Sequence, residues 1–169
     1  MFYYIRKDKE YKKIVKEIFR NSNFKKLYNI EHHGISRMEH SVRISYYSYV
    51  IAKFLRMDYV SVARGALLHD FFLDGDERTL KEKFLDTFTH PRRALSTAID
   101  NFNVNKIEKN IIVSHMFPIY LSLPKYKESF LVNSVDKIIG FKELVRGFAC
   151  KFNYKFNYSY VFILLLMTR

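Results

Sequence analysis

The sequence predicts an all-α fold, and three observations support this class. The 169 residues include only five Gly and three Pro, which is too little turn punctuation for a β-sandwich or barrel. Apolar side chains recur at helical spacing, and before residue 151 no convincing stretch alternates apolar and polar residues as a half-buried strand would. Hydrophobic residues make up 49% of the chain, which is enough to bury a substantial core. We therefore expect one helical domain over residues 1–169.

The expected helices follow one another from the N-terminus. Residues 9–20 alternate Ile, Val and Phe with Lys and Glu at helical spacing and predict an exposed amphipathic helix. Residues 36–57 form the longest helical stretch, and its apolar positions cover so much of the circumference that we expect it to pack centrally. Asp58 suits the N-cap of a helix over 59–69. After a charged loop, a short charged helix is expected from about Thr79.

Proline and asparagine mark the starts of the later helices. Pro91 suits the first position of a helix and would place His90 at its cap. Asn105 and Glu108 have the spacing of a capping box, which predicts a helix that ends near His115.

A last long helix and a tail of undecided structure complete the chain. The helix should span about residues 129–148. Beyond it, residues 152–158 alternate like a strand, and residues 161–167 are strongly apolar. For the tail at 151–169 three alternatives stay open: a further helix, pairing with another chain, or partial disorder.

Charge and composition limit the classes of partner. A net charge of +12 favours anionic partners, but the lysines are dispersed along the chain, so nucleic acid is possible and not favoured. The single cysteine, Cys150, excludes an intrachain disulfide framework and suits a reducing compartment. The apolar N-terminus is too short for a signal peptide, and the longest apolar run falls far below the ~20 residues of a spanning helix. We expect a cytoplasmic protein without a membrane span.

Six potential metal ligands recur in order along the chain, with at least one on or beside each of five expected helices. They are His40, His69, Asp70, His90, His115 and Asp136. The gaps between them correspond to about one helix and one turn. Successive helices can therefore return their ligands to a shared point.

Several of these residues stand among apolar neighbours, where an unpaired polar group is costly. His69 and Asp70 end an apolar helical run, and an aspartate at a helix C-terminus needs a compensating cation. His115 and Asp136 are also flanked by aliphatic residues, whereas His40 alone is more often a hydrogen-bonded core residue. Imidazole and carboxylate ligands together predict one or two divalent transition metal ions, namely Fe, Mn, Zn, Co or Ni.

The ordered pattern resembles that of the HD-domain phosphohydrolases, a family of helical bundles. The resemblance covers about residues 30–148, which leaves the N-terminal helix and the tail outside it. The matching stretches are Ser-Arg-Met-Glu-His-Ser at 36–41, Ala-Leu-Leu-His-Asp at 66–70, Thr-His-Pro at 89–91, Ser-His-Met at 114–116 and Val-Asp-Lys at 135–137.

The resemblance implies a particular set of metal ligands. The basic family pattern implies one metal ion on His40, His69, Asp70 and Asp136. His90 and His115 resemble the additions of the binuclear branch, which imply a second ion with Asp70 as the bridge. That branch includes cyclic-nucleotide and cyclic-dinucleotide phosphodiesterases. The Gly-Tyr-Pro signature of the cyclic-dinucleotide subgroup is absent, so this substrate is not supported.

The resemblance further implies hydrolysis of a nucleotide or a related phosphoester, with a metal-bound hydroxide attacking phosphorus. Candidate catalytic residues are Asp70, Arg37 and His33, the last as a proton donor, a phosphate ligand or a turn residue without a role. Candidate substrate-binding residues are Arg37, one turn before His40, then Arg92 and Arg93 at an expected helix N-terminus, and Lys137. For each of these cations, an ordinary surface charge remains the alternative.

Two other functions fit the same pattern. Some members of the fold with two irons are oxygenases, which would keep the metal and change the reaction. A non-catalytic module could instead bind RNA or a partner through its basic surface. The six intact ligand positions argue against such a module, since a degenerate copy tends to lose some of them.

Overall fold

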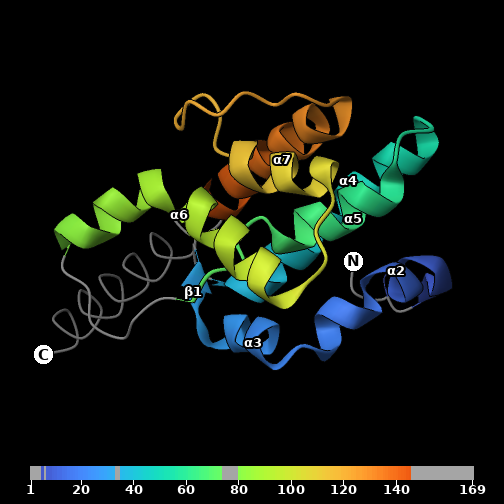
Figure 1. The fold of residues 1–169 in the computed structure, drawn as a ribbon, viewed down its shortest axis with the longest axis horizontal. Helices are drawn as coiled ribbons and strands as arrows, with labels where there is room; N and C mark the ends of the chain where they lie inside the picture. Colours follow the sequence, from blue (N-terminus) through green and yellow to red (C-terminus); the bar gives the residue numbers. More distant parts are fainter. Residues whose placement is uncertain (1–4, 6, 33–34, 74–79, 146–169) are drawn as a thin grey trace, which may run out of the picture.

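Most of the described chain is helical in the computed structural model, with only two strands of two residues each among the described residues, which confirms the all-α class (Figure 1). The structure describes residues 5, 7–32, 35–73 and 80–145, without the side chains of 31–32 and 80–88. His33, the loop before residue 80, Cys150 and the tail at 151–169 lie outside the described residues. The helices are α2 (Lys9–Arg20), α3 (Ser22–Lys25), the 3-10 helix η1 (Lys26–Asn29), α4 (Arg37–Phe54), α5 (Tyr59–Leu68), α6 (Leu80–Asn101), α7 (Lys106–Ser114) and a last helix over 127–145.

A small hairpin interrupts the helices just before α4. Strand β1 (Glu31–His32) pairs antiparallel with β2 (Ile35–Ser36). These strands were not expected from the sequence, because two residues are too few to show an alternating pattern. Ser36 then caps α4 by accepting a hydrogen bond from the Glu39 backbone N–H.

The N-terminal helix α2 is amphipathic, as predicted, and packs its apolar face onto the bundle. Its buried residues are Tyr11, Val15 and Ile18. The Tyr11 hydroxyl donates to Ser45 Oγ at 2.8 Å, and Ser45 Oγ donates to the Ala63 carbonyl at 2.6 Å. One buried hydrogen-bond chain therefore joins α2, α4 and α5.

Helix α4 is central, as predicted, but some of the apolar residues that were expected to pack are exposed. Tyr47 is 46% exposed and Phe54 is 85% exposed among the described residues. The buried side instead includes the small residues Ser41, Ser45 and Ser48. Small side chains allow a neighbouring helix to approach closely, so the buried face of α4 is more polar than a hydrophobic pattern can show.

The helix expected to start at Pro91 does not exist as a separate element. Helix α6 is continuous from Leu80 to Asn101, with Pro91 inside it, and its 22 residues exceed the 18 of α4. An interior proline costs about 3 kcal/mol, because it removes one backbone hydrogen bond. Pro91 is buried together with Ala94 and Ala98, and the burial of this face offsets that cost.

Helix α5 lies between two groups of packed apolar residues. Ala63, Leu67 and Leu68 belong to the larger group, which also includes residues of α2, α4 and α6. Val62 and Ala66 belong to the smaller group, together with residues of α4, α7 and the last helix. The residues that follow α5 therefore emerge near the centre of the molecule.

The predicted caps of α5 and α7 are confirmed. Asp58 accepts a hydrogen bond from the Ser61 backbone N–H at the start of α5. Asn105 and Glu108 form a full capping box on α7. The last helix begins at residue 127, two residues earlier than predicted. None of the described helices is both long and apolar enough to cross a membrane.

Candidate metal centre

The structure brings all six predicted ligands together, from five helices. His40 lies in the first turns of α4, His90 lies inside α6, and Asp136 lies in the last helix. His69 and His115 are the C-cap residues of α5 and α7, and Asp70 directly follows His69. Helices that pack around one core thus deliver their ligands to one point, as the spacing predicted.

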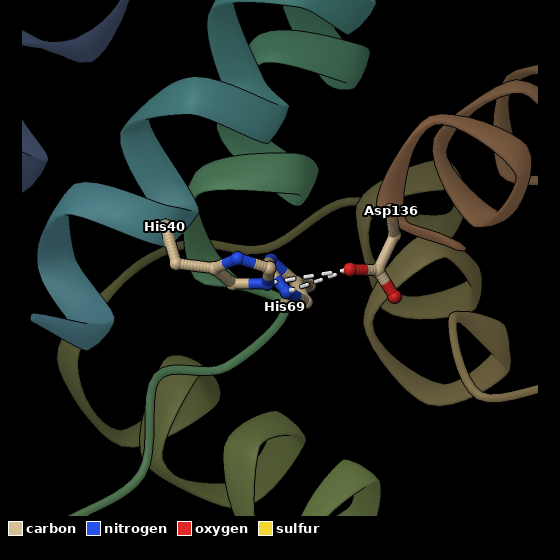
Figure 2. A group of neighbouring side chains, drawn as sticks. All are labelled: His40, His69 and Asp136. Carbon is tan, nitrogen blue, oxygen red and sulfur yellow. Dashed lines mark ion pairs between the residues drawn. The ribbon is translucent and has the colours of Figure 1, made fainter. Parts of the chain in front are cut away.

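His40, His69 and Asp136 form the first group of possible ligands (Figure 2). The Nε2 atoms of His40 and His69 lie 3.3 and 3.9 Å from Asp136 Oδ1. Both imidazoles point toward the carboxylate, which approaches from the opposite side (Figure 2). The two histidines are buried, and the Asp136 side chain is 14% exposed.

Asp70 joins this group to a second one. Its Oδ2 atom lies 3.6 Å from His69 Nε2, whereas its Oδ1 atom lies 3.6 Å from His90 Nε2 and 3.5 Å from His115 Nε2. The Nε2 atoms of His90 and His115 are 3.0 Å apart. His69, Asp70 and His115 by themselves are close enough to hold one ion. Asp70 therefore presents one oxygen to each side.

Three of the histidines have the same orientation toward the centre. His69 Nδ1 lies 2.7 Å from the Ala66 carbonyl, and His115 Nδ1 lies 2.8 Å from the Ile112 carbonyl. His40 Nδ1 lies 2.7 Å from Glu143 Oε2. A carbonyl or carboxylate oxygen accepts, so each Nδ1 donates its proton and each Nε2 faces inward. This is the tautomer that a metal-binding histidine needs.

The electrostatics of the site also fit a cation. Burial lowers the pKa of His115 to about 4 and also lowers the pKa of His90, so both imidazoles are neutral ligands at pH 7. Burial alone would lower the pKa of His40, but hydrogen bonds with Asp136 and Glu143 raise it to about 10. In the absence of a metal, a proton on His40 thus balances the carboxylates that surround it.

Asp136 is ionised in the same surroundings. Burial alone would raise the pKa of its carboxyl group, but the hydrogen bond with His40 and the nearby His69 and His115 lower it overall. His69 Nε2 is buried and has no hydrogen-bond partner in the described part of the chain. A bound cation would satisfy this nitrogen and neutralise the carboxylates.

The separations between donor atoms fit metal binding. Ligand atoms about 2.0–2.2 Å from one ion lie about 3–3.5 Å from one another. The separations of 3.0–3.9 Å in the structure are close to this range. Buried His and Asp residues could therefore hold a metal ion. Nitrogen and carboxylate oxygen ligands suit Fe, Mn, Zn, Co or Ni.

The predicted cationic residues divide into two kinds. Arg37 is buried, donates from Nη1 to the Phe72 carbonyl at 2.8 Å and lies 3.9 Å above the Phe72 ring. Arg93 donates to the Leu73 carbonyl at 3.0 Å and lies 5.1 Å from the same ring. Phe72 in turn packs on His90, with ring centroids 5.4 Å apart. Both arginines thus lie beside the His90 side of the centre.

The other two cations have weaker connections to the centre. Arg92 is exposed and lies 5.8 Å from the Tyr120 ring. Since α6 is continuous, Arg92 and Arg93 do not occupy a helix N-terminus, and the anion-binding argument made from that position is wrong. Lys137 is exposed, and its Nζ lies 3.4 Å from the His115 carbonyl.

Glu143 is a residue of the site that the sequence analysis missed. It lies seven residues after Asp136 on the last helix, and residues seven apart share a face of a helix. Its carboxylate is buried between His40 and Arg43. An acidic residue two turns from a predicted ligand was the signal that could have found it.

The six donors therefore converge in the fold as their order along the chain predicted. Comparisons with known proteins identified no relative of this chain. No family model matches the chain, and neither a curated protein nor a solved structure does.

Proposed function

We propose that this chain is a metal-dependent phosphohydrolase of the HD type that acts on a nucleotide or a related phosphoester. One observation carries the proposal: six His and Asp donors from five helices converge, and three imidazoles turn Nε2 inward with Nδ1 fixed by an acceptor. Such a set is costly to bury without a cation. Its order along the chain, H…HD…H…H…D, is the order of the binuclear branch.

Asp70 is the residue on which a second ion depends. Its two oxygens face opposite groups of ligands. The Asp70 carboxylate could therefore bind one ion together with His40, His69 and Asp136 and a second ion together with His90 and His115. Bound divalent ions would lower the pKa of a water molecule and offset charge on a phosphoryl group. The protein's own part is to hold these donors in place before the substrate arrives.

The substrate side of the site is the face of His90, Phe72, Arg37 and Arg93. Each arginine holds a backbone carbonyl of residues 72–73, so its guanidinium is positioned before any ligand binds. Guanidinium groups match the geometry and the charge of a phosphate. We infer that Arg37 and Arg93 orient the phosphate group. Arg92 and Lys137 stay weaker candidates for binding the substrate, and His33 stays a candidate catalytic residue.

A metal and substrate screen tests the proposal. The purified protein is assayed for bound metal and for hydrolysis of phosphomonoesters, nucleotides and cyclic nucleotides with added Mn²⁺, Co²⁺ or Ni²⁺. We expect metal-dependent turnover that falls by at least about 100-fold in Asp70→Ala. Asp100→Ala is the matched control, because Asp100 is exposed on α6, ten residues after His90.

Two results would contradict the proposal. One is a wild-type protein that holds no metal and is matched by Asp70→Ala in every assay. The other is oxygen consumption by the iron-loaded protein without turnover of any phosphoester, which would favour an oxygenase on the same ligands.

A further inference from the structure

Glu143 is a buried carboxylate that contacts the ligand His40 on the ring nitrogen that faces away from the other ligands. Its Oε2 lies 2.7 Å from His40 Nδ1, and its Oε1 accepts a hydrogen bond from Arg43 Nη1 at 3.1 Å. Arg43 also pairs with Glu39 one turn earlier on α4. A chain of charged contacts thus runs from Glu39 through Arg43 and Glu143 to His40.

The position of His40 in its helix explains why it needs this partner. His69 and His115 cap the C-termini of α5 and α7, where the last carbonyls have no partner within the helix. Each ring uses such a carbonyl three residues back, that of Ala66 or Ile112. His40 lies inside α4, where the neighbouring carbonyls serve the helix itself, so its Nδ1 proton must find an acceptor on another element.

The acceptor that it finds is charged and held in place. The carboxylate faces Nδ1, while Nε2 points toward Asp136. Arg43 holds the second oxygen of Glu143 on the side away from the centre. A carboxylate acceptor fixes the tautomer and the orientation of a ligating imidazole and makes its other nitrogen a better donor.

We propose that Glu143 is the positioning residue of His40, which sets the affinity of the His40–His69–Asp136 group for its metal ion. Glu143 does so without touching the ion itself. This inference rests on the metal site of the proposed function. The Nδ1 protons of His69 and His115 are accepted instead by neutral backbone carbonyls.

Metal titration of matched variants tests the inference. The dissociation constant of Mn²⁺ is measured by calorimetry for the wild-type chain, Glu143→Ala and Glu143→Gln. We expect Glu143→Ala to weaken binding at the tighter of the resolved sites by about 10–100-fold. Glu143→Gln keeps an accepting oxygen and loses the charge, so its loss should lie between wild type and Glu143→Ala.

Glu108→Gln is the control for removing a buried carboxylate that pairs with an arginine. Glu108 is buried, and its Oε1 accepts a hydrogen bond from Arg64 Nε at 2.7 Å. Its Oε2 accepts from the Asn105 backbone N–H, so neither bond involves one of the six donors. We expect its Mn²⁺ affinity to equal that of wild type. The melting temperature of each metal-free variant shows whether it is folded.

A spectroscopic readout separates positioning from simple stability. In the Zn²⁺-loaded protein with ¹⁵N-labelled histidine, His40 should carry a downfield proton on Nδ1 that is absent from Glu143→Ala. The signals of His69 and His115 should keep their Nδ1 protons in both proteins, because backbone carbonyls accept them.

The outcomes distinguish this inference from the function on which it rests. A folded Glu143→Ala that binds Mn²⁺ with the wild-type constant overturns the role of Glu143 and leaves the phosphohydrolase proposal intact. A wild-type chain that binds none of Mn²⁺, Fe²⁺, Zn²⁺, Co²⁺ and Ni²⁺ overturns both. If Glu143→Ala does not fold, Glu143→Gln decides: a loss of about threefold or more supports the role, and the wild-type constant overturns it.

Discussion

A close approach between α5 and α7 should make alanine at position 65 costly. A Cβ atom added to Gly65 would lie 3.0 Å from Ile111 Cδ1, 3.2 Å from Ile111 Cβ and 3.2 Å from the Cα of Glu108. The last of these is backbone, which cannot turn aside as a side chain can. The two helices would have to separate by a few tenths of an ångström.

Gly140 provides the matched control in the last helix. A Cβ added there meets nothing within 4 Å, so Gly140→Ala carries the gain in helix propensity alone. We expect Gly140→Ala to stabilise the fold by about 0.5–1 kcal/mol. Gly65→Ala has the same gain but adds an overpacking cost of about 1–3 kcal/mol. Its free energy of unfolding should therefore fall by roughly 0–2.5 kcal/mol relative to wild type.

The two variants are compared by thermal and urea unfolding without metal. They should differ by about 1–3 kcal/mol, which corresponds to about 2–12 °C in melting temperature for a chain of this size. The Mn²⁺ affinity should also fall in Gly65→Ala, since α5 and α7 carry His69 and His115, whose ring centroids are 4.9 Å apart. A Gly65→Ala protein as stable as Gly140→Ala would refute the tight packing of these helices.

Three further predictions test other parts of the account. Asn105→Ala removes the capping box that Asn105 forms with Glu108 and should cost about 0.5–2 kcal/mol in urea unfolding. Tyr11→Phe removes the buried bond to Ser45 and should cost about 0.5–1.5 kcal/mol; a variant of unchanged stability would show that this bond contributes nothing. Mn²⁺ at 100 times its dissociation constant should stabilise the wild type by about 2.7 kcal/mol, or about 5–11 °C in melting temperature. Asp136→Asn should lose most of this shift, and chelation with EDTA should reverse it in the wild type.

The main helices and the six donors could be predicted from the sequence because each depends on a local signal. Capping residues such as Asp58 and Asn105 act within one turn, and their side chains bond as predicted. His69 and Asp70 stood out because they end an apolar run. The spacing of about one helix and one turn between successive ligands predicted that they would lie close together, and in the structure they do.

The features that the sequence did not reveal depend on contacts between distant elements. Pro91 predicted a helix start, but burial of its face in the core lets α6 continue through it. Ser45 of α4 is buried and bonds the Ala63 carbonyl of α5, a contact that no hydrophobic pattern records. Glu143 meets the site through a contact with His40, which is 103 positions away along the chain.

The central claim is that these six residues form a metal centre with Asp70 between two ions. Anomalous X-ray diffraction from crystals grown with Mn²⁺ tests it most directly. We expect two peaks, each about 2.1 Å from its ligand atoms. One should lie between His40, His69 and Asp136, the other between His90 and His115, and Asp70 should contact both. Anomalous peaks confined to surface carboxylates, with none among the six donors, would contradict the claim.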